Sequence, residues 1–376
     1  MGMSSKKPTI LITAGTRPEA VKVAPLIRLL REQGWARVRV LATAQHRELL
    51  DQVFEFFEIK PDIDLNIMQP EQSLPDLTGR LVPAIDRVLS EEQPDIVLAQ
   101  GDTTTVMATA LACFYRQIPF GHVEAGLRTG RKYYPFPEEV NRVLVSRLGD
   151  LHFAPTMRSR DNLLREGTHE SAVVVTGNTV IDALLWAIER DLPKTFEPVD
   201  GRKMILVTAH RRENFGAPLE SICAALCDLV ESRDVEVVYP VHPNPKVVET
   251  VEKHLKDKPR IRLVSPLDYA EFVAAMKASY LILTDSGGVQ EEAPSLGKPV
   301  LVLRDETERP EGVEAGTACI VGPNRERIIE KAVELIDHAD AYDRVARACN
   351  PYGDGKASTR IADVIQAFLV KGSIGA

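Results

Sequence analysis

The sequence predicts an α/β protein with two Rossmann-like domains whose parallel sheets face a central cleft. Short apolar runs rich in β-branched residues alternate with longer helical patterns along nearly all of its 376 residues. Such alternation is typical of parallel sheets that helices cover on both faces. The runs are too many for one sheet, and a polar, proline-containing stretch at 190–203 divides them into two equal groups.

The first group of runs predicts the sheet of an N-terminal domain that comprises residues 1–178. A helical pattern at 103–116 begins with Thr103, a plausible N-cap, and has one apolar face. A C-terminal helix at 359–376 is expected to cross back and join this domain. The expected strands are 9–15, 38–43, 95–101, 119–125, 151–156 and 172–178. The apolar face of the helix comprises Val106, Ala110, Leu111 and Phe114.

The second group predicts the sheet of a C-terminal domain that comprises residues 179–358. Helical patterns again separate the runs, so this sheet is expected to be parallel as well. The expected strands are 204–210, 235–242, 261–266, 280–287, 299–305 and 318–323.

The composition excludes some classes of binding partner and indicates the cellular compartment. The formal net charge of −8 argues against a general nucleic-acid or anionic-membrane binder. No apolar run approaches the roughly 20 residues of a membrane span, and the first residues lack a signal-peptide stretch. The five cysteines are scattered, which predicts reduced thiols in a cytoplasmic protein. Cys223 and Cys227 stand four apart without further ligands nearby, so no metal site is expected.

Polar side chains concentrate where the expected strands end. Ligands of open α/β sheets bind beyond the carboxyl ends of the strands, so these residues are the first candidates for a site. They are Arg17, Gln45, His46, Asp102, Glu124, His210, His242 and the run Asp285-Ser286-Gly287-Gly288.

The stretch TDSGGVQEEAPSLGKP at 284–299 predicts an anion site at a strand-to-helix turn. Gly287 and Gly288 allow close approach to the backbone, and the first helical amides favour a phosphate. Ser286 adds a hydroxyl donor, and Glu292 is placed to bind ribose hydroxyls. An ordinary glycine turn followed by acids that the helix dipole favours is an equal alternative.

Two further stretches suggest phosphate contacts. AGTRPEAVK places Arg17 and Lys22 around a helix start, although a solvated helix start explains them equally well. AHRRENFG places His210 and Arg211 at a strand end, which favours a polyanion site over a solvated face. His242 follows the next strand and fits a structural role at least as well.

Three carboxylates form a second group of candidates. Asp102 and Glu124 end neighbouring expected strands, and Glu138 lies near a helix start in YPFPEEVNR. Such acids can act as general acid, general base or stabilisers of a cationic intermediate. The alternatives are an N-cap for Asp102 and a first-turn acid for Glu138.

Long motifs throughout the chain resemble those of the non-hydrolysing bacterial UDP-N-acetylglucosamine 2-epimerases. The resemblance runs from residue 9 to about 370 and implies the two-domain GT-B architecture and a homodimer. It also implies interconversion of UDP-GlcNAc and UDP-ManNAc for surface polysaccharides, with neither a nicotinamide cofactor nor a required metal. The motifs include GTRPEA, TAQHRELLDQ, GDTTT, GHVEAGLRTG, PEEVNR, GNTVIDAL, AHRRENFG, YPVHPNP, DSGGVQEEAPSLGKPVLVLRDETERPE and NPYGDG.

The resemblance also implies roles for individual residues. The diphosphate would be held by Arg17, His210, Ser286, Gly287 and Gly288, with Glu292 on the ribose, Arg309 on the nucleotide and Phe272 beside uracil. The sugar would be surrounded by Lys22, Asp102, Glu124 and Glu138. A second UDP-GlcNAc would bind as allosteric activator to Gln45, Gln72, Arg211 and His242.

The expected reaction eliminates UDP to a 2-acetamidoglucal and adds it back after protonation of the opposite face. Asp102, Glu124 and Glu138 are the expected acids and bases, assisted by Lys22 and His210. The competing hypotheses are a hydrolysing 2-epimerase, a GT-B glycosyltransferase and a catalytically silent nucleotide-sugar sensor.

Overall fold

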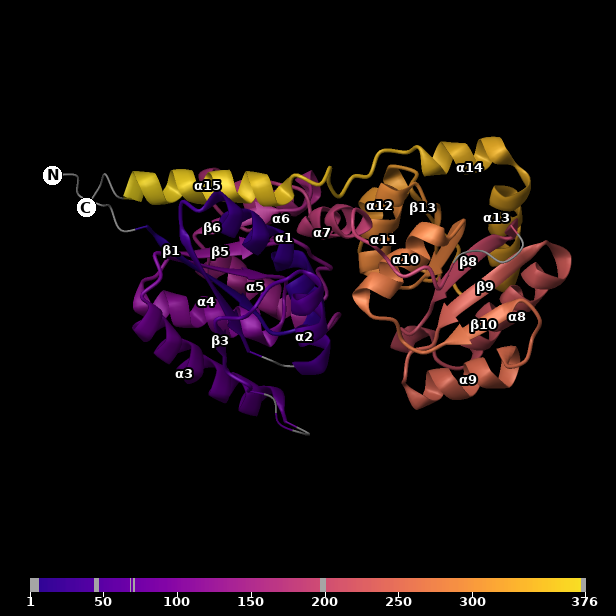
Figure 1. Cartoon of the computed structure of the whole chain (residues 1–376), viewed down its shortest axis with the longest axis horizontal. Coiled ribbons are helices and arrows are strands. Elements are labelled where there is room, and N and C mark those ends of the chain that lie inside the picture. Colours follow the sequence, from indigo (N-terminus) through magenta and orange to yellow (C-terminus); the bar gives the residue numbers. More distant parts are fainter. Residues whose placement is uncertain (1–6, 44–46, 68, 70–71, 197–200, 373–376) are drawn as a thin grey trace. The chain divides into compact units, whose positions relative to one another are not determined.

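A computed structural model describes residues 7–43, 47–67, 69, 72–196 and 201–372 (Figure 1). The chain divides into two compact units. Unit 1 comprises Met1–Ala183 and Gly353–Ala376, and unit 2 comprises Leu184–Tyr352. The limits expected from the sequence are 178 and 358. Helix α7 (Thr179–Ile188) contains the first limit, so no polar linker marks it.

Unit 1 contains a seven-stranded parallel sheet with the order β3-β2-β1-β4-β5-β6-β7. All six strands expected in this part of the chain are present. The structure adds β3, which has two residues and lies in a polar segment, so it leaves no apolar run in the sequence. The strands are β1 (Thr9–Ala14), β2 (Arg37–Ala42), β3 (Ile63–Asp64), β4 (Ile96–Gln100), β5 (Phe120–Val123), β6 (Leu151–Ala154) and β7 (Val173–Val175).

Helices surround the sheet of unit 1, and the last helix of the chain belongs to it. Helix α15 (Ala357–Gly372) packs on α1 (Arg17–Gln33), as Figure 1 shows. The buried carboxylate of Asp182 accepts the amide hydrogen bonds of Ala357 and Ser358 at 3.2 and 2.7 Å. The other helices are α2 (Arg47–Phe56), α3 (Leu74–Glu92), α4 (Thr104–Arg116), α5 (Glu138–Leu148), α6 (Met157–Arg165) and the short η1 (Glu170–Ala172).

Helix α4 begins as the sequence predicts, but its buried face differs at the C-terminal end. The Thr103 hydroxyl accepts the amide hydrogen bond of Val106, so Thr103 is the N-cap. The prediction that Phe114 shares the apolar face is wrong, because its side chain is 60% exposed. Residues four apart rotate progressively around a helix of 3.6 residues per turn, and Cys113 occupies the buried position instead.

Unit 2 contains a six-stranded parallel sheet with the order β10-β9-β8-β11-β12-β13. All six strands expected here are present, and those expected at 204–210, 235–242 and 280–287 end before His210, His242 and Asp285. The strands are β8 (Lys203–Thr208), β9 (Val235–Pro240), β10 (Ile261–Val264), β11 (Leu281–Thr284), β12 (Val300–Val302) and β13 (Ala318–Ile320). The helices are α8 (Ala217–Ser232), α9 (Pro245–Leu255), α10 (Tyr269–Ala278), α11 (Gly287–Glu292), α12 (Pro310–Glu314), α13 (Arg325–Asp337), α14 (Ala339–Ala346), η3 (Arg212–Asn214) and η4 (Ala293–Leu296).

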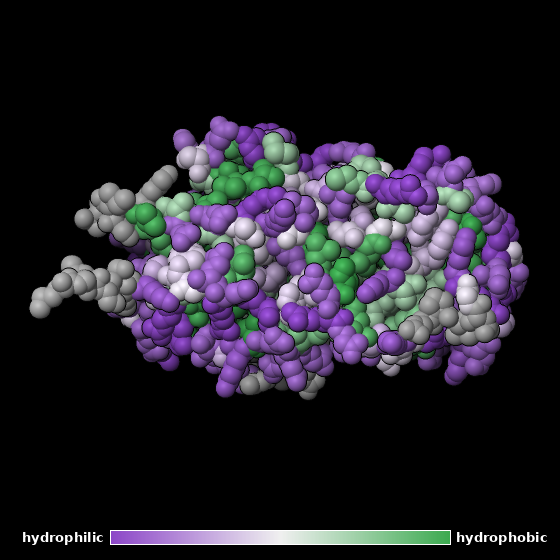
Figure 2. All heavy atoms as spheres, turned by 45° about the horizontal axis from the view of Figure 1, so that its top comes forward, coloured by the Kyte–Doolittle hydropathy of each residue, from purple (hydrophilic) through white to green (hydrophobic). Residues whose placement is uncertain are grey.

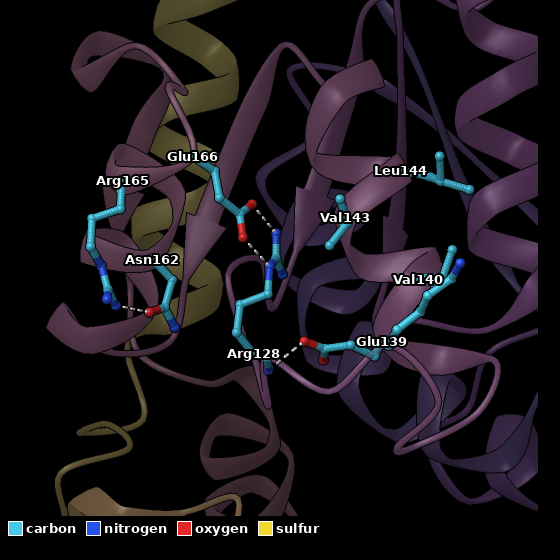
Figure 3. A pocket seen from close by; sticks show the side chains of 10 residues that line it. Arg128, Glu139, Val140, Val143, Leu144, Asn162, Arg165 and Glu166 are labelled. Carbon is cyan, nitrogen blue, oxygen red and sulfur yellow. Dashed lines mark hydrogen bonds and ion pairs between the residues drawn. The ribbon is translucent and has the colours of Figure 1, made fainter.

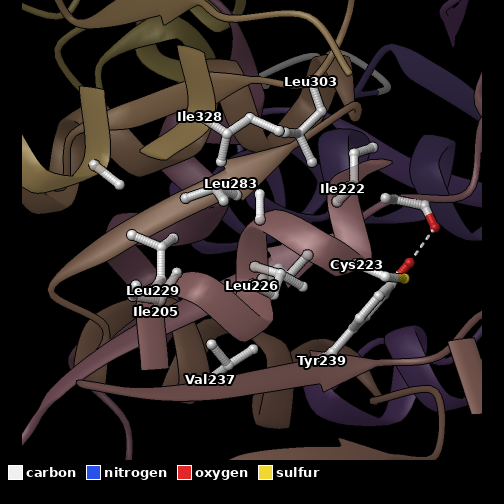
Figure 4. Close-up of a cluster of buried hydrophobic side chains, with 14 of the residues drawn as sticks. Ile205, Ile222, Cys223, Leu226, Leu229, Val237, Tyr239, Leu283, Leu303 and Ile328 are labelled. Carbon is white, nitrogen blue, oxygen red and sulfur yellow. Dashed lines mark hydrogen bonds between the residues drawn. The ribbon is translucent and has the colours of Figure 1, made fainter. Parts of the chain in front are cut away.

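The core of unit 2 supports the loop that follows β8. Leu226 of α8 packs with Ile205 and Val237 from the sheet, and all three are fully buried (Figure 4). At the edge of this cluster the buried hydroxyl of Tyr239 donates a hydrogen bond to the Ala209 carbonyl at 2.7 Å. This contact fixes the backbone next to His210.

Among the residues that the structure describes, no helix is both long and apolar enough to cross a membrane. Hydrophilic side chains predominate on the face drawn in Figure 2, and hydrophobic side chains form separate patches between them.

Candidate active site

Glu124 of unit 1 is surrounded by hydrogen-bond donors. It follows β5 directly, and its backbone φ is 65°, an uncommon conformation for a residue other than glycine. Lys22 Nζ of α1 lies 2.5 Å from Glu124 Oε1, and Asn178 Nδ2 donates to the same oxygen at 2.8 Å. The Gln100 amide donates to Oε2. The structure therefore joins two residues predicted from sequence, Lys22 and Glu124, with two that were not predicted.

Asp102 lies one strand away from Glu124, beyond the end of β4. Gln100 and Val123 are paired in the two strands, so both carboxylates lie at the same edge of the sheet. The Arg142 guanidinium donates to Asp102 Oδ2 from Nε and Nη2, both at 2.8 Å. Because Thr103 is the N-cap of α4, the N-cap alternative for Asp102 is wrong. Asp102 is instead oriented by an arginine of α5.

Glu138 is the first residue of α5 and is partly buried. Its neighbour Glu139 is buried and accepts amide hydrogen bonds from Thr129 and Gly130, the shorter contacts at 3.0 and 2.8 Å. Glu139 also accepts a hydrogen bond from Arg142 Nη1 at 3.1 Å. Glu139, which was not predicted as a site residue, orders the loop before Glu138 and supports the arginine that holds Asp102.

Glu19 connects the loop of Arg17 with the loop of Asp102. Its Oε2 accepts the amide hydrogen bonds of Gly15 and Thr16 at 2.6 and 2.7 Å, and its Oε1 accepts one from the Thr103 hydroxyl. Burial raises the pKa of Glu19, and the hydrogen bonds from Thr103, Gly15 and Thr16 oppose that shift. The spacing of Thr16 and Glu19 is a capping box, a sequence signal that could have found this residue. Arg17 begins α1 directly after this loop and is partly buried.

His122 lies within β5, is buried, and has a structural rather than a catalytic setting. Its Nε2 donates a hydrogen bond to the Gly101 carbonyl at 2.7 Å. Burial lowers its pKa from 6.5 to about 3, so the ring is neutral.

His210 of unit 2 lies beside a buried carboxylate. Asp285 follows β11, and its Oδ2 accepts the amide hydrogen bonds of His210 and Arg211, both at 2.7 Å. The Asn214 side chain donates to the same oxygen at 3.0 Å. Burial lowers the pKa of His210, and the negative charge of Asp285 opposes that effect.

His242 follows β9 and lies against His210. The two imidazole rings are stacked with centroids 5.3 Å apart and planes 10° apart. His242 is exposed, and its Nδ1 accepts the amide hydrogen bond of Asn244 at 3.1 Å. Arg211 is also exposed. The structure thus brings three of the sequence-predicted residues together at the ends of β8 and β9.

The glycine turn after β11 has two charged side chains close to its backbone. A Cβ atom added to Gly287 would lie 3.6 Å from the Arg309 guanidinium, and one added to Gly288 would lie 3.8 Å from Glu292 Oε2. Both side chains are buried, at 9% and 7% exposure. The Ser286 amide donates to the Thr284 hydroxyl at 2.9 Å, which sets the direction of the turn. All five residues expected to bind UDP in this region therefore lie around one turn.

Helix α10 adds aromatic residues to this region. The Tyr269 hydroxyl is 3.5 Å from Glu292 Oε1, to which it donates a hydrogen bond. Phe272 lies on the same helix and is partly buried. Tyr269 was not predicted, because only its contact with Glu292 distinguishes it from an ordinary core aromatic.

Of the four expected allosteric residues, the structure brings Arg211 and His242 together beside His210 and does not test the set as a whole. Gln45 lies outside the described residues, as does His46. Gln72 belongs to unit 1 and accepts a hydrogen bond from Arg80, whereas Arg211 and His242 belong to unit 2. This set remains a prediction.

A pocket of about 540 Å³ lies elsewhere on unit 1, beside α5 and α6 (Figure 3). Arg128 forms two hydrogen bonds of 2.8 Å with Glu166 at one side, and apolar residues of α5 face the other side. The pocket includes Glu139 but not Glu138. Its lining residues are Arg128, Gly130, Lys132, Glu139, Val140, Val143, Leu144, Asn162, Arg165 and Glu166.

Within the described part of the chain, no three His, Cys, Asp or Glu side chains are grouped so that they could hold an ion. All five cysteines are free, and burial raises the pKa of Cys223 to about 12.

Comparisons with known proteins match nearly the whole chain to one enzyme family. A family model for UDP-N-acetylglucosamine 2-epimerase matches residues 28–366. The UDP-N-acetylglucosamine 2-epimerase of Escherichia coli K12 is 51% identical over 368 residues, which cover 95% of this chain and 98% of the relative. The enzyme of the same name from Bacillus subtilis 168 is 52% identical over 360 residues, which cover 95% of each chain.

A solved structure is similar in fold as well as sequence. The UDP-GlcNAc 2-epimerase of Neisseria meningitidis, in a crystal structure bound to UDP-GlcNAc, superposes with a TM-score of 0.89 at 47% identity. The match covers 96% of this chain and 100% of that chain. The chain belongs to the UDP-N-acetylglucosamine 2-epimerase family.

Proposed function

We propose that this protein interconverts UDP-GlcNAc and UDP-ManNAc by inverting C2 of the sugar without net hydrolysis. The observation that carries the proposal is the buried Lys22–Glu124 pair with its two amide donors, next to the strand that precedes Asp102. Such a group of oriented carboxylates is suited to proton transfer. The relative from Neisseria meningitidis, which binds UDP-GlcNAc, supports the choice of substrate.

The chemistry of the sugar requires the nucleotide to leave first. The C2 hydrogen of UDP-GlcNAc has no neighbouring carbonyl, so its direct removal would be very unfavourable. Cleavage of the bond between C1 and the diphosphate oxygen sends its electron pair to UDP and leaves C1 cationic. Loss of the C2 proton to a carboxylate then forms the C1–C2 double bond of 2-acetamidoglucal. Protonation of the other face of C2 and return of UDP to C1 give UDP-ManNAc.

The residues of unit 2 are assigned to the leaving nucleotide. Backbone amides of the glycine turn and the cations around it stabilise the negative charge that develops on the diphosphate. Glu292, which Tyr269 orients, binds the ribose. Phe272 lies beside the uracil in this proposal. The diphosphate ligands of this unit are His210, Arg309, Ser286, Gly287 and Gly288, and the family resemblance also assigns Arg17 to the diphosphate.

The acids of unit 1 are assigned to the proton transfers. The base for one face of C2 and the acid for the other come from the set Asp102, Glu124 and Glu138. The positive charge of Lys22 favours the ionised form of Glu124. Two faces need two proton-transfer positions, which accounts for more than one acid. A third acid stabilises the positive charge at C1.

The proposal includes the setting of the reaction. The enzyme needs no cofactor, works in the cytoplasm as a homodimer and supplies UDP-ManNAc for surface polysaccharides. UDP-GlcNAc acts in addition as an allosteric activator at Gln45, Gln72, Arg211 and His242. These statements rest on the family resemblance of the sequence.

One experiment separates the proposal from its competitors. The protein is incubated with UDP-GlcNAc in D₂O and the mixture is followed by NMR. We expect UDP-ManNAc with deuterium at C2, together with label in recovered UDP-GlcNAc. Accumulation of free UDP and ManNAc would indicate a hydrolysing enzyme, and no turnover would indicate a sensor or a transferase that lacks its acceptor.

A further inference from the structure

The two carboxylate oxygens of Asp285 have different surroundings. The side chain is fully buried at the end of β11. Its Oδ2 accepts hydrogen bonds from the His210 amide, the Arg211 amide and the Asn214 side chain, at 2.7, 2.7 and 3.0 Å. Its Oδ1 accepts no hydrogen bond within the described structure. A buried carboxylate oxygen without a donor is costly, so a partner for Oδ1 is expected.

The ring of His210 lies close to Oδ1 of Asp285. His210 Nδ1 lies 3.4 Å from Oδ1. The backbone of His210 is already fixed, because its amide donates to Oδ2 of the same carboxylate and Tyr239 binds the preceding carbonyl. A hydrogen bond from Nδ1–H to Oδ1 therefore requires a change only in the side-chain angles of His210, because the backbone is held in place. The charged or titratable groups that face His210 are Asp285, Arg211 and His242.

We propose that Asp285 is a positioning residue that accepts a hydrogen bond from His210 Nδ1–H and thereby directs His210 Nε2 toward the substrate. The proposal rests on the proposed role of His210 at the diphosphate. In a histidine, the hydrogen bond made by one ring nitrogen decides the state of the other. With the Nδ1 proton bound to Asp285, Nε2 faces the substrate, and it donates to a phosphate oxygen when the ring is an imidazolium.

The charge of Asp285 serves the same purpose. A leaving diphosphate is best stabilised by an imidazolium, which has protons on both nitrogens. Burial and the neighbouring Arg211 and His242 lower the pKa of His210, and Asp285 opposes all three effects. Asp285 therefore favours the imidazolium in a place that would otherwise disfavour it.

The substitution Asp285→Asn tests this role with little change of shape. The three donors at Oδ2 require an acceptor, so the amide oxygen of the new side chain must occupy that place. The amide nitrogen then faces His210 and donates to Nδ1, which forces the proton onto Nε2. The variant keeps the loop contacts and reverses the tautomer, whereas a merely structural role for Asp285 predicts no reversal.

The tautomer is measured by ¹⁵N NMR of histidine-labelled protein without substrate, above the pKa of His210. Comparison with His210→Gln identifies the signal among the eight histidines. We expect a protonated Nδ1 in the wild type and a protonated Nε2 in Asp285→Asn. We also expect the pKa of His210 to fall in the variant, because the negative charge that raises it is removed. A protonated Nε2 in the wild type would overturn the proposal, and this result needs no variant to fold.

Asn214→Ala is the matched control. It removes one donor from Oδ2 and leaves Oδ1 and the ring untouched, so the tautomer of His210 should not change. In the epimerisation assay we expect kcat of Asp285→Asn to fall about tenfold or more, with UDP binding retained. If the wild type is active but Asp285→Asn leaves the tautomer of His210 unchanged, the role of Asp285 is refuted and the proposed function is not. An inactive wild type with the expected tautomer would refute the proposed function instead.

Discussion

Lys22 Nζ lies 2.5 Å from Glu124 Oε1, although 102 residues separate the two in the sequence. Their side chains are only 13% and 5% exposed. A buried ion pair contributes little net stability relative to apolar residues, but removal of one partner leaves an uncompensated charge. The pair is therefore better explained by a function of Glu124 than by stability.

Replacement of Glu124 by glutamine should abolish most of the epimerisation activity. The amide keeps the size of the side chain but can neither accept the C2 proton nor neutralise Lys22, so we expect a loss of about 10²- to 10⁴-fold in kcat. We also expect a loss of roughly 3 kcal/mol in the free energy of unfolding. The measurements are an NMR rate assay and urea unfolding. Glu166→Gln, which removes the partner of Arg128 instead, is the control and should keep its activity.

Replacement of Asp102 by asparagine should separate catalysis from nucleotide binding. Arg142 keeps a hydrogen-bond acceptor at this position, so the fold should be retained. We expect no detectable epimerisation, while calorimetry still shows UDP binding with an affinity within about threefold of the wild type. A variant with full activity would remove Asp102 from the mechanism.

Gly287→Ala should weaken nucleotide binding without loss of fold. The added methyl group would lie 3.6 Å from the Arg309 guanidinium, an ordinary contact, but it would occupy the space that a diphosphate needs. Loss of charge-assisted hydrogen bonds predicts a decrease of about tenfold or more in UDP affinity. Gly79→Ala is the control, because a Cβ there meets no atom within 4 Å. Equal UDP affinities for the two variants would contradict the proposed diphosphate site.

Stability should fall in acid partly because of His122. Its pKa is lowered from 6.5 to about 3 by burial, so between these values the unfolded chain binds a proton that the folded protein excludes. The contribution to stability is complete above pH 6.5 and is lost as the pH falls toward 3.

The substitution His122→Gln should make this acid dependence less steep. Glutamine can still donate to the Gly101 carbonyl, but it binds no proton. We expect the free energy of unfolding to decrease by about 1 kcal/mol less per pH unit between about pH 6 and pH 4. His152, whose pKa is also lowered, remains in both proteins and does not affect the comparison. Urea titrations at several pH values give the slopes, and equal slopes would contradict the prediction.

The strands of both sheets could be predicted because buried parallel strands are apolar on both faces and form continuous runs in the sequence. Strand β3 was missed because two residues form no run. Phe114 was misplaced because a regular spacing of apolar residues does not show which of them lies at the protein surface.

Candidate site residues could be predicted where their position follows directly from the strand that precedes them. Residues at strand ends, such as Asp102 and His210, follow from the sheet. Asn178 and Tyr269 act through contacts with residues 54 and 23 positions away in the sequence, and no pattern around them indicates this. Glu139 binds a loop nine residues before it, which no pattern around it indicates either. Asp285 was noted at a strand end, but only the structure shows that one of its oxygens organises a loop while the other faces a ring.

The last described helix, α15, packs on α1, which is the first helix described. The amides of the first two residues of α15 donate hydrogen bonds to Asp182. Unit 1 is therefore assembled from both ends of the polypeptide, with the whole of unit 2 inserted between them. During synthesis on the ribosome, the earlier segments of unit 1 cannot bury the surface that α15 covers until residues 357–372 have left the exit tunnel. Unit 2, synthesised without interruption, has no such delay and can complete its fold first.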